Sequence, residues 1–152
     1  MKNGFTLIEL VVVLGLIAIL SVGGLVSARG MQRREIQNAS TAIQADMRQA
    51  QRLAVIEGRR YRIRFDQVNH RYFVYPVGEF VYEPIYLPAD VFIHNMNLPI
   101  GQIEYLPRGT LGGHAAHGFT LVLRNQRYEQ RLTIIPSSGR VAYEEVTPLR
   151  LR

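Results

Sequence analysis

Three features of this 152-residue chain could take part in chemistry: a carboxylate at the start of a long apolar segment, a histidine pair and a serine pair. His114 and His117 lie in a glycine-rich segment with no carboxylate or cysteine close in sequence, so we interpret them as polar loop residues rather than metal ligands. Ser137 and Ser138 stand in Pro-Ser-Ser-Gly, which is typical of a turn and lacks the pattern around a nucleophilic serine. Glu9 is the residue that needs a chemical explanation.

The composition argues against several kinds of site. The chain has no cysteine, which leaves no disulfide, no cysteine-based zinc site and no thiol nucleophile. Gly112 and Gly113 lack the spacing and the lysine of a phosphate-binding loop. We therefore predict that the protein is not an enzyme and has no catalytic residue, no metal site and no cofactor. A chain of this length has room for one modest domain.

Glu9 directly precedes an apolar run at residues 10–26, in which Ser21 is the only polar side chain. The run would form about 26 Å of helix, and Ser27 and Ala28 extend it toward the ~30 Å hydrocarbon core of a bilayer. A carboxylate in a membrane helix costs roughly 2.5–3.5 kcal/mol at the bilayer centre and less near an end, and it normally has a partner. One interpretation is a helix-end residue that reaches headgroups and complements the helix dipole. The other is a residue with a functional partner.

The residues around Glu9 favour the second interpretation. The string Gly4-Phe5-Thr6-Leu7-Ile8-Glu9-Leu10 resembles the processing site of type IV pilins and type II secretion pseudopilins. The resemblance implies that a membrane prepilin peptidase cuts after Gly4 and methylates the new N-terminal residue, Phe5. It also implies that Glu9 is the filament-assembly residue, because its carboxylate would neutralise the cationic amine of a neighbouring subunit inside an apolar bundle.

The same resemblance implies a location and a set of partners. It places the chain in the cytoplasmic (inner) membrane as a single-pass protein with its head outside the cytoplasm, and then in a pilus or pseudopilus. The implied partners are the prepilin peptidase, other pilin or pseudopilin subunits, the inner-membrane assembly platform and, before assembly, membrane lipid. Charge alone predicts the opposite orientation, because Arg29, Arg33 and Arg34 follow the apolar run.

A helical pattern continues beyond the apolar run. Polar residues fill the face opposite the apolar one, and no proline occurs before Pro76, whereas Gly58 is a natural helix stop. We therefore predict a helix from about residue 5 to residue 57, roughly 80 Å long if unbroken. The predicted apolar stripe, at spacings of three and four, consists of Ile36, Ala39, Ile43, Met47, Ala50 and Ala54, widened at its end by Leu53, Val55 and Ile56; the predicted polar face carries Gln37, Gln44, Arg48, Gln51 and Arg52.

After Gly58 the pattern alternates with a period of two, which is typical of strands. Tyr61, Ile63 and Phe65 alternate with arginines, and a turn at 66–70 leads into a second strand. We predict α+β architecture, with a long N-terminal helix packed against a mostly antiparallel β-sheet head. The expected strands of that head cover 61–65, 72–75, 81–87, 91–93, 103–106, 119–123, 131–135 and 141–143, with a loop at 109–118.

A second resemblance covers nearly the whole chain. The segment Ala54-Val55-Ile56-Glu57-Gly58 before the first hairpin, the later Leu106-Pro107-Arg108-Gly109 and the final Pro136-Ser137-Ser138-Gly139-Arg140-Val141 resemble the GspH/FimT group of minor pseudopilins and minor pilins. Major pilins often carry a proline at the position of Val26, so its absence favours a minor subunit.

These observations predict four segments and one main function. The segments are a leader at 1–4, a transmembrane and filament-core helix at 5–28, an amphipathic helix at 29–57 and a β-rich head at 58–152. The resemblance implies a minor pseudopilin or minor pilin that helps to initiate or cap a filament.

Two alternatives remain open at this stage. The formal charge of +6 would suit a DNA-uptake (competence) pilin with an arginine-rich, DNA-binding head, although the arginines are spread among twelve acidic residues and nucleic acid is the weaker expectation. The other alternative is a membrane-anchored protein of unrelated function, in which Glu9 is only a helix-end residue.

Overall fold

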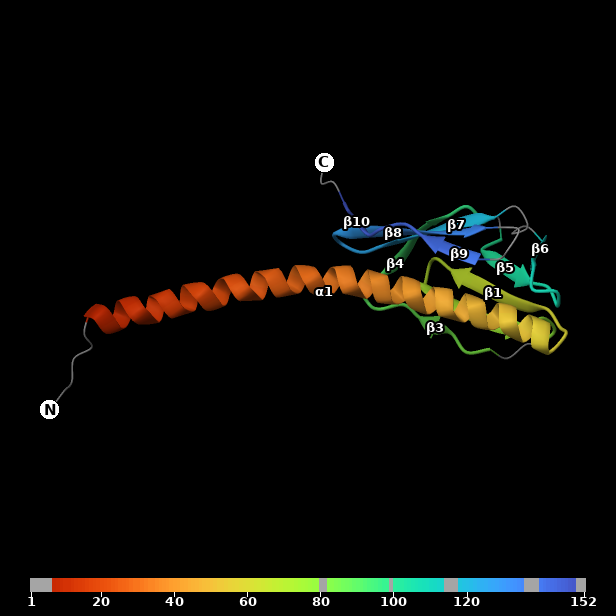
Figure 1. The fold of residues 1–152 in the computed structure, drawn as a ribbon, viewed down its shortest axis with the longest axis horizontal. Helices are drawn as coiled ribbons and strands as arrows, with labels where there is room; N and C mark the ends of the chain where they lie inside the picture. Colours follow the sequence, from red (N-terminus) through yellow and green to blue (C-terminus); the bar gives the residue numbers. More distant parts are fainter. Residues whose placement is uncertain (1–6, 80–81, 99, 114–117, 136–139, 150–152) are drawn as a thin grey trace.

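A single long helix and a β head make up the protein, shown as a computed structural model in Figure 1. The structure describes residues 7–79, 82–98, 100–113, 118–135 and 140–149, and for residues 20–29 it describes the backbone alone. One half of the helix projects away from the head, and the other half lies along it (Figure 1). The predicted α+β architecture is confirmed.

The helix, α1, spans Leu7–Ile56, close to the predicted 5–57. It stops where Glu57 N donates to Leu53 O (2.9 Å) and Gly58 takes a positive φ of 64°. A left-handed residue after the last turn is the common way to end a helix, and glycine adopts that conformation without a steric penalty.

Two five-stranded antiparallel sheets form the head. The first has the order β3-β2-β1-β5-β6, so that β1, in full register with β2, also pairs with β5. Its strands are β1 (Tyr61–Asp66), β2 (Arg71–Pro76), β3 (Ile85–Tyr86), β5 (Gln102–Tyr105) and β6 (Leu111–Gly112).

The second sheet has the order β10-β8-β7-β4, and β9 also pairs with β8. The pairing of β4 with β7 shifts register between Ile93 and Asn95, which marks a bulge in this edge strand. Its strands are β4 (Phe92–Met96), β7 (Phe119–Arg124), β8 (Tyr128–Ile135), β9 (Arg140–Tyr143) and β10 (Thr147–Pro148).

The core forms where the second half of α1 packs on both sheets. The predicted stripe of the helix is confirmed, since all six of its main residues from Ile36 to Ala54 are at most 3% exposed. Inward-facing strand residues such as Ile63 and Leu132 meet this stripe. Three of the six helix residues are alanines, and these small side chains let the helix backbone approach the sheets closely.

Polar anchors fix the helix on the second sheet. Ser40 donates its hydroxyl hydrogen to Oε1 of Gln130 (2.5 Å), and Gln44 Nε2 donates to the carbonyl of Val141 (2.9 Å). Both helix side chains are buried. The prediction that Gln44 belongs to the exposed polar face is therefore wrong, because its amide finds a backbone acceptor on β9.

A matching anchor holds α1 to the first sheet. The hydroxyl of Tyr72, on β2, donates to the carboxylate of Asp46 at 2.5 Å. Burial of the Tyr72 ring is the main cause that raises the pKa of Tyr72 well above its ordinary value, and the Asp46 carboxylate raises it further. Tyr72 thus stays a neutral donor at physiological pH, and its bond resists a sliding of the helix along the sheet.

Other differences from the predicted elements concern short segments. Val55 and Ile56 are 52% and 77% exposed, so the prediction that they widen the buried stripe is wrong. The expected strand at 81–87 is reduced to Ile85–Tyr86, with residue 81 outside the described part. Leu111–Gly112 form β6 inside the predicted loop, and Thr147–Pro148 form the unpredicted β10.

The helix stripe gives a first testable prediction. Ile43 is fully buried, and Ile43→Ala should lower the free energy of unfolding by about 2–5 kcal/mol, because it deletes buried methyl groups and leaves a cavity. Ile56→Ala removes the same atoms from an exposed position and should change it by less than about 0.5 kcal/mol. Near-UV circular dichroism of tyrosine during urea unfolding of the full chain in detergent measures both. Equal effects of the two variants would contradict this core.

The hairpin turn between β1 and β2 gives a second prediction, about pH. The carboxylate of Asp66 accepts hydrogen bonds from Asn69 Nδ2 and Asn69 N and from Arg71 Nε, and these donors lower the pKa of Asp66 to about 2. A carboxyl whose pKa is lower in the folded than in the unfolded chain stabilises the fold above its unfolded pKa of about 3.9, and this contribution is lost as the pH falls toward 2.

The melting temperatures of the wild type and of Asp66→Asn, measured from pH 6 to pH 2, test this sign. The variant should melt lower at pH 6, and the gap should narrow as the pH falls through the range between about 4 and 2. Asp90→Asn, a change at an exposed aspartate without a hydrogen bond to the described residues, should show no such narrowing. A gap between wild type and Asp66→Asn that stays constant with pH would contradict the assignment.

Candidate assembly interface

Of the sequence-predicted site residues, the structure describes Glu9 alone, at the free end of α1. Glu9 is in the first turn of the helix, with an exposed side chain, and Leu10 follows it into the apolar run. Gly4 and Phe5, the predicted cleavage and methylation positions, lie outside the described residues. An acidic side chain in the first turn complements the positive end of the helix dipole.

The first half of α1 carries apolar side chains that nothing in the described chain covers. Figure 1 shows this half extending beyond the head with no strand beside it. Ten large apolar side chains between Leu7 and Ile19 are exposed, from 44% at Val13 to 82% at Leu7. They surround the helix on all sides, which is typical of a helix that is buried by other molecules rather than by its own domain.

Within the described residues, no helix is both long and apolar enough to cross a membrane. The segment predicted to span the membrane, 5–28, falls partly outside that description, which leaves out residues 5 and 6 and the side chains of 20–29.

An ion pair lies where the helix enters the head. Arg33 donates through Nη2 to Oε1 of Glu145 at 3.1 Å, and both side chains are well exposed. Exposed pairs of this kind contribute little stability. Arg34 is exposed beside it, and the side chain of Arg29 is outside the described part. One of the three arginines that argue against the expected orientation is therefore compensated by a head carboxylate.

The other candidates from the sequence are placed as follows. His114, His117, Ser137 and Ser138 lie outside the described residues. Gly112 is buried in β6, where an added Cβ would lie 3.0 Å from a methyl group of Leu106, so a packing requirement accounts for this glycine. The described residues contain no group of three histidine, cysteine, aspartate or glutamate side chains able to hold a metal ion.

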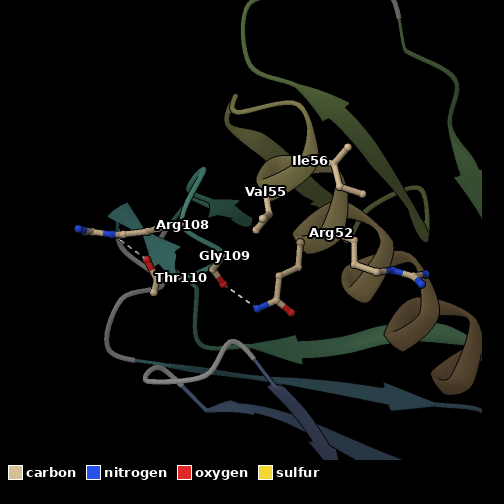
Figure 2. Close-up of a pocket in the computed structure, with 7 residues that line it drawn as sticks. Arg52, Val55, Ile56, Arg108, Gly109 and Thr110 are labelled. Atoms are coloured by element: carbon tan, nitrogen blue, oxygen red, sulfur yellow. Dashed lines mark hydrogen bonds between the residues drawn. The ribbon is translucent and has the colours of Figure 1, made fainter.

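A hollow that sequence reasoning missed lies at the opposite end of the helix from Glu9. Figure 2 shows it between the last turns of α1 and the turn that joins β5 to β6. It has a volume of about 500 Å³ and is lined by Gln51, Arg52, Val55, Ile56, Arg108, Gly109 and Thr110.

The turn on one side of this hollow is tightly specified. Gly109 N donates to Leu106 O (2.8 Å), Leu106 N donates to Thr110 O (2.9 Å), and Gln51 Nε2 on α1 donates to Gly109 O (2.6 Å). Gly109 has a φ of +79°, and a Cβ there would lie 3.2 Å from Val55.

The sequence did contain a signal that Val55 and Ile56 are exposed on the helix side of this hollow. Strict spacing from Ala54 puts the next stripe position at 57 or 58 and leaves Val55 and Ile56 off the core face.

Comparisons with known proteins match the N-terminal motif and the fold independently. The prokaryotic N-terminal methylation motif matches residues 1–25. Among curated proteins, none matches the chain.

Solved structures match the helix and head. The minor pseudopilin EpsH from the type 2 secretion system of Vibrio cholerae superposes with a TM-score of 0.58 at 14% identity, over 73% of this chain and 97% of that one. A second EpsH structure gives a TM-score of 0.58 at 12% identity, over 79% and 99% of the two chains. The type IV minor pilin FimU of Pseudomonas aeruginosa gives 0.58 at 17% identity, over 74% and 90%.

At these identities the structural likeness establishes the fold, and the motif establishes the type of N-terminus. The motif covers the first 25 residues, whereas the structural matches cover about three quarters of the chain. The chain thus combines a prokaryotic N-terminal methylation motif with a fold similar to that of a minor pseudopilin and a minor pilin.

Proposed function

We propose that the chain is a minor subunit of a type II secretion pseudopilus or a type IV pilus, which helps to initiate or cap the filament. The observation that carries the proposal is the methylation motif at residues 1–25, which includes the helix segment from Leu7 to Ile19 with its exposed apolar side chains. The likeness of the fold to a minor pseudopilin and a minor pilin supports a minor rather than a major subunit.

The first step is processing in the cytoplasmic membrane, with the head outside the cytoplasm. Prepilin peptidase cuts after Gly4, which lacks a side chain and so allows the protease close to the backbone. The cut creates a cationic amine on Phe5, which the same enzyme methylates. Phe5 and Glu9 are four residues apart, the spacing at which two side chains share one helix face.

The second step is transfer from lipid into the filament. Burying a Val, Leu or Ile side chain stabilises by about 1.5–3 kcal/mol, so the exposed apolar half of α1 stays in lipid until neighbouring helices cover it. In a bundle of such helices, Glu9 faces a dry environment, where an unpaired carboxylate is costly. The amine on Phe5 of a neighbour then supplies the opposite charge, and the pair sets the axial register between subunits.

Processing yields a prediction for the mature N-terminus. The protein isolated from its native membrane should begin at N-methylated Phe5, which intact-mass spectrometry resolves. Gly4→Val places a branched side chain at the cut, and the variant should remain at full length from Met1. A wild-type chain that begins at Met1, or one cut after Ala28, would contradict the proposal.

Glu9 yields a prediction for assembly. Glu9→Gln keeps the size of the side chain but removes its charge and replaces one acceptor oxygen by an amide donor. The chain should be processed normally and should enter the filament at least about tenfold less, as expected for the loss of an ion pair worth 1.4 kcal/mol or more. Immunoblots of sheared or affinity-purified filaments measure incorporation.

Glu83→Gln, a matched change at an exposed carboxylate of the head, should leave incorporation unchanged. If Glu9→Gln assembles like the wild type, Glu9 is a helix-end residue, and the chain is an anchored protein of another kind. Retained processing in the variant keeps this result separate from a failure at Gly4.

A further inference from the structure

The hollow at the end of α1 continues into a second one along the helix. The second hollow, of about 660 Å³, is lined by Ala45, Arg48, Gln51, Arg52, Arg140 and Val141, and so shares Gln51 and Arg52 with the first. We call the two together the distal groove. From Ala45 to Ile56 it follows about 16 Å of helix, the length of roughly five residues of extended peptide.

Positive charge is concentrated in the distal groove. Four arginines line it (Arg48, Arg52, Arg108 and Arg140), and no acidic residue is among its described lining. Arg48 and Arg52 make no ion pair with the described residues, and Nε of Arg108 donates to the hydroxyl of Thr110 (3.1 Å). Outside the groove, Arg34, Arg64, Arg124 and Arg127 also make no ion pair with the described residues, whereas six arginines pair with carboxylates within 4 Å: Arg33, Arg59, Arg60, Arg62, Arg71 and Arg131.

Neither carboxylate next to the groove in sequence pairs with its arginines. Asp46, beside Ala45, accepts from the hydroxyl of Tyr72. Glu57 follows the last turn of α1, but its Oε2 accepts from Arg59 Nε (2.7 Å) and from the hydroxyl of Tyr61 (2.8 Å). The hydrogen bond from Arg59, and to a smaller extent that from Tyr61, hold the pKa of Glu57 below its ordinary value. Glu57 is therefore committed to the first sheet, and the groove keeps its positive charge.

The shape of the groove favours an extended ligand over a small anion. In Figure 2 the side chains of Arg52 and Arg108 lie on opposite sides of the hollow and point away from each other, so one phosphate or carboxylate cannot contact both guanidinium groups. The exposed apolar side chain of Val55 lies between them, and Ile56, which is also exposed, belongs to the same lining. A ligand that matches this surface carries separated negative charges with apolar groups between them.

The lining also favours a peptide over a nucleic acid. Proteins that bind single-stranded nucleic acid combine basic grooves with aromatic side chains on which the bases stack. None of the described lining residues of the distal groove is aromatic. An extended peptide with alternating acidic and apolar residues presents one kind of side chain on each face.

We propose that the distal groove binds an extended acidic and apolar peptide segment of a partner protein, with Arg52 and Arg108 contacting its carboxylates and Val55 and Ile56 its apolar side chains. The groove is at the other end of α1 from Glu9, and its binding does not depend on filament assembly. A failure of the proposed assembly function therefore leaves this proposal standing, and the reverse also holds.

Fluorescence anisotropy with the full chain in uncharged detergent tests the proposal. The probe is a fluorescein-labelled (Glu-Leu)3 peptide, with empty micelles as the baseline and a (Lys-Leu)3 peptide as the charge control. We expect saturable binding of (Glu-Leu)3, weakened by added salt, and no saturable binding of (Lys-Leu)3. Absence of saturable (Glu-Leu)3 binding overturns the proposal, as does equal binding of both peptides.

Charge-reversal variants locate the site. Arg52→Glu and Arg108→Glu should each raise the Kd for (Glu-Leu)3 about tenfold, since each replaces an attraction by a repulsion of similar size. Arg64→Glu makes the same charge change at an exposed position on β1, outside the groove, and should alter the Kd less than about twofold.

Two further results would overturn the assignment. An equal loss with Arg64→Glu would mean that the peptide responds only to net charge. Displacement of (Glu-Leu)3 by a twelve-nucleotide oligothymidine of equal or higher affinity would make the groove a nucleic-acid site. Unchanged near-UV circular dichroism of the variants shows that binding, and not folding, is measured, as expected for exposed arginines.

Discussion

One helix has to satisfy two different environments, and the rest of the structure depends on that constraint. The stripe from Ile36 to Ala54 is buried against both sheets, while the side chains from Leu7 to Ile19 project where the head cannot reach them. Burial of the second half positions the head, and exposure of the first half requires other molecules to complete the structure. The interface that we propose for assembly is thus a consequence of where the head ends.

Polar contacts fix the position of α1 along the two sheets. Apolar stripes alone tolerate small slides, because dispersion and hydrophobic burial have little directionality. Gln44 and Ser40 bind the second sheet and Asp46 binds Tyr72 of the first, so both sides of the helix are tied to particular strand atoms. A slide along the helix would leave buried polar atoms unpaired, at roughly 1–3 kcal/mol each.

The sequence predicted those features that depend on neighbours along the chain. The methylation motif, the helix stripe and the first hairpin are local patterns, and the structure and the comparisons confirm them. Gln44 was misplaced because its partner, the carbonyl of Val141, is 97 residues away. The two-residue strands β6 and β10 carry too little pattern to be recognised. The distal groove was not predicted because, like the position of Gln44, it depends on residues distant in sequence: it exists only where Gln51 meets the turn at Gly109.

The two proposed sites are separated along one helix, and this separation has a functional consequence. From Glu9 to Arg52 the helix rises about 65 Å, far beyond the Debye length of about 8 Å, so the charge of one site does not influence the other. Assembly through the first half of α1 covers apolar surface there and leaves the distal groove unchanged. If both proposals hold, the subunit is held by its neighbours at one end while its opposite end still binds a partner.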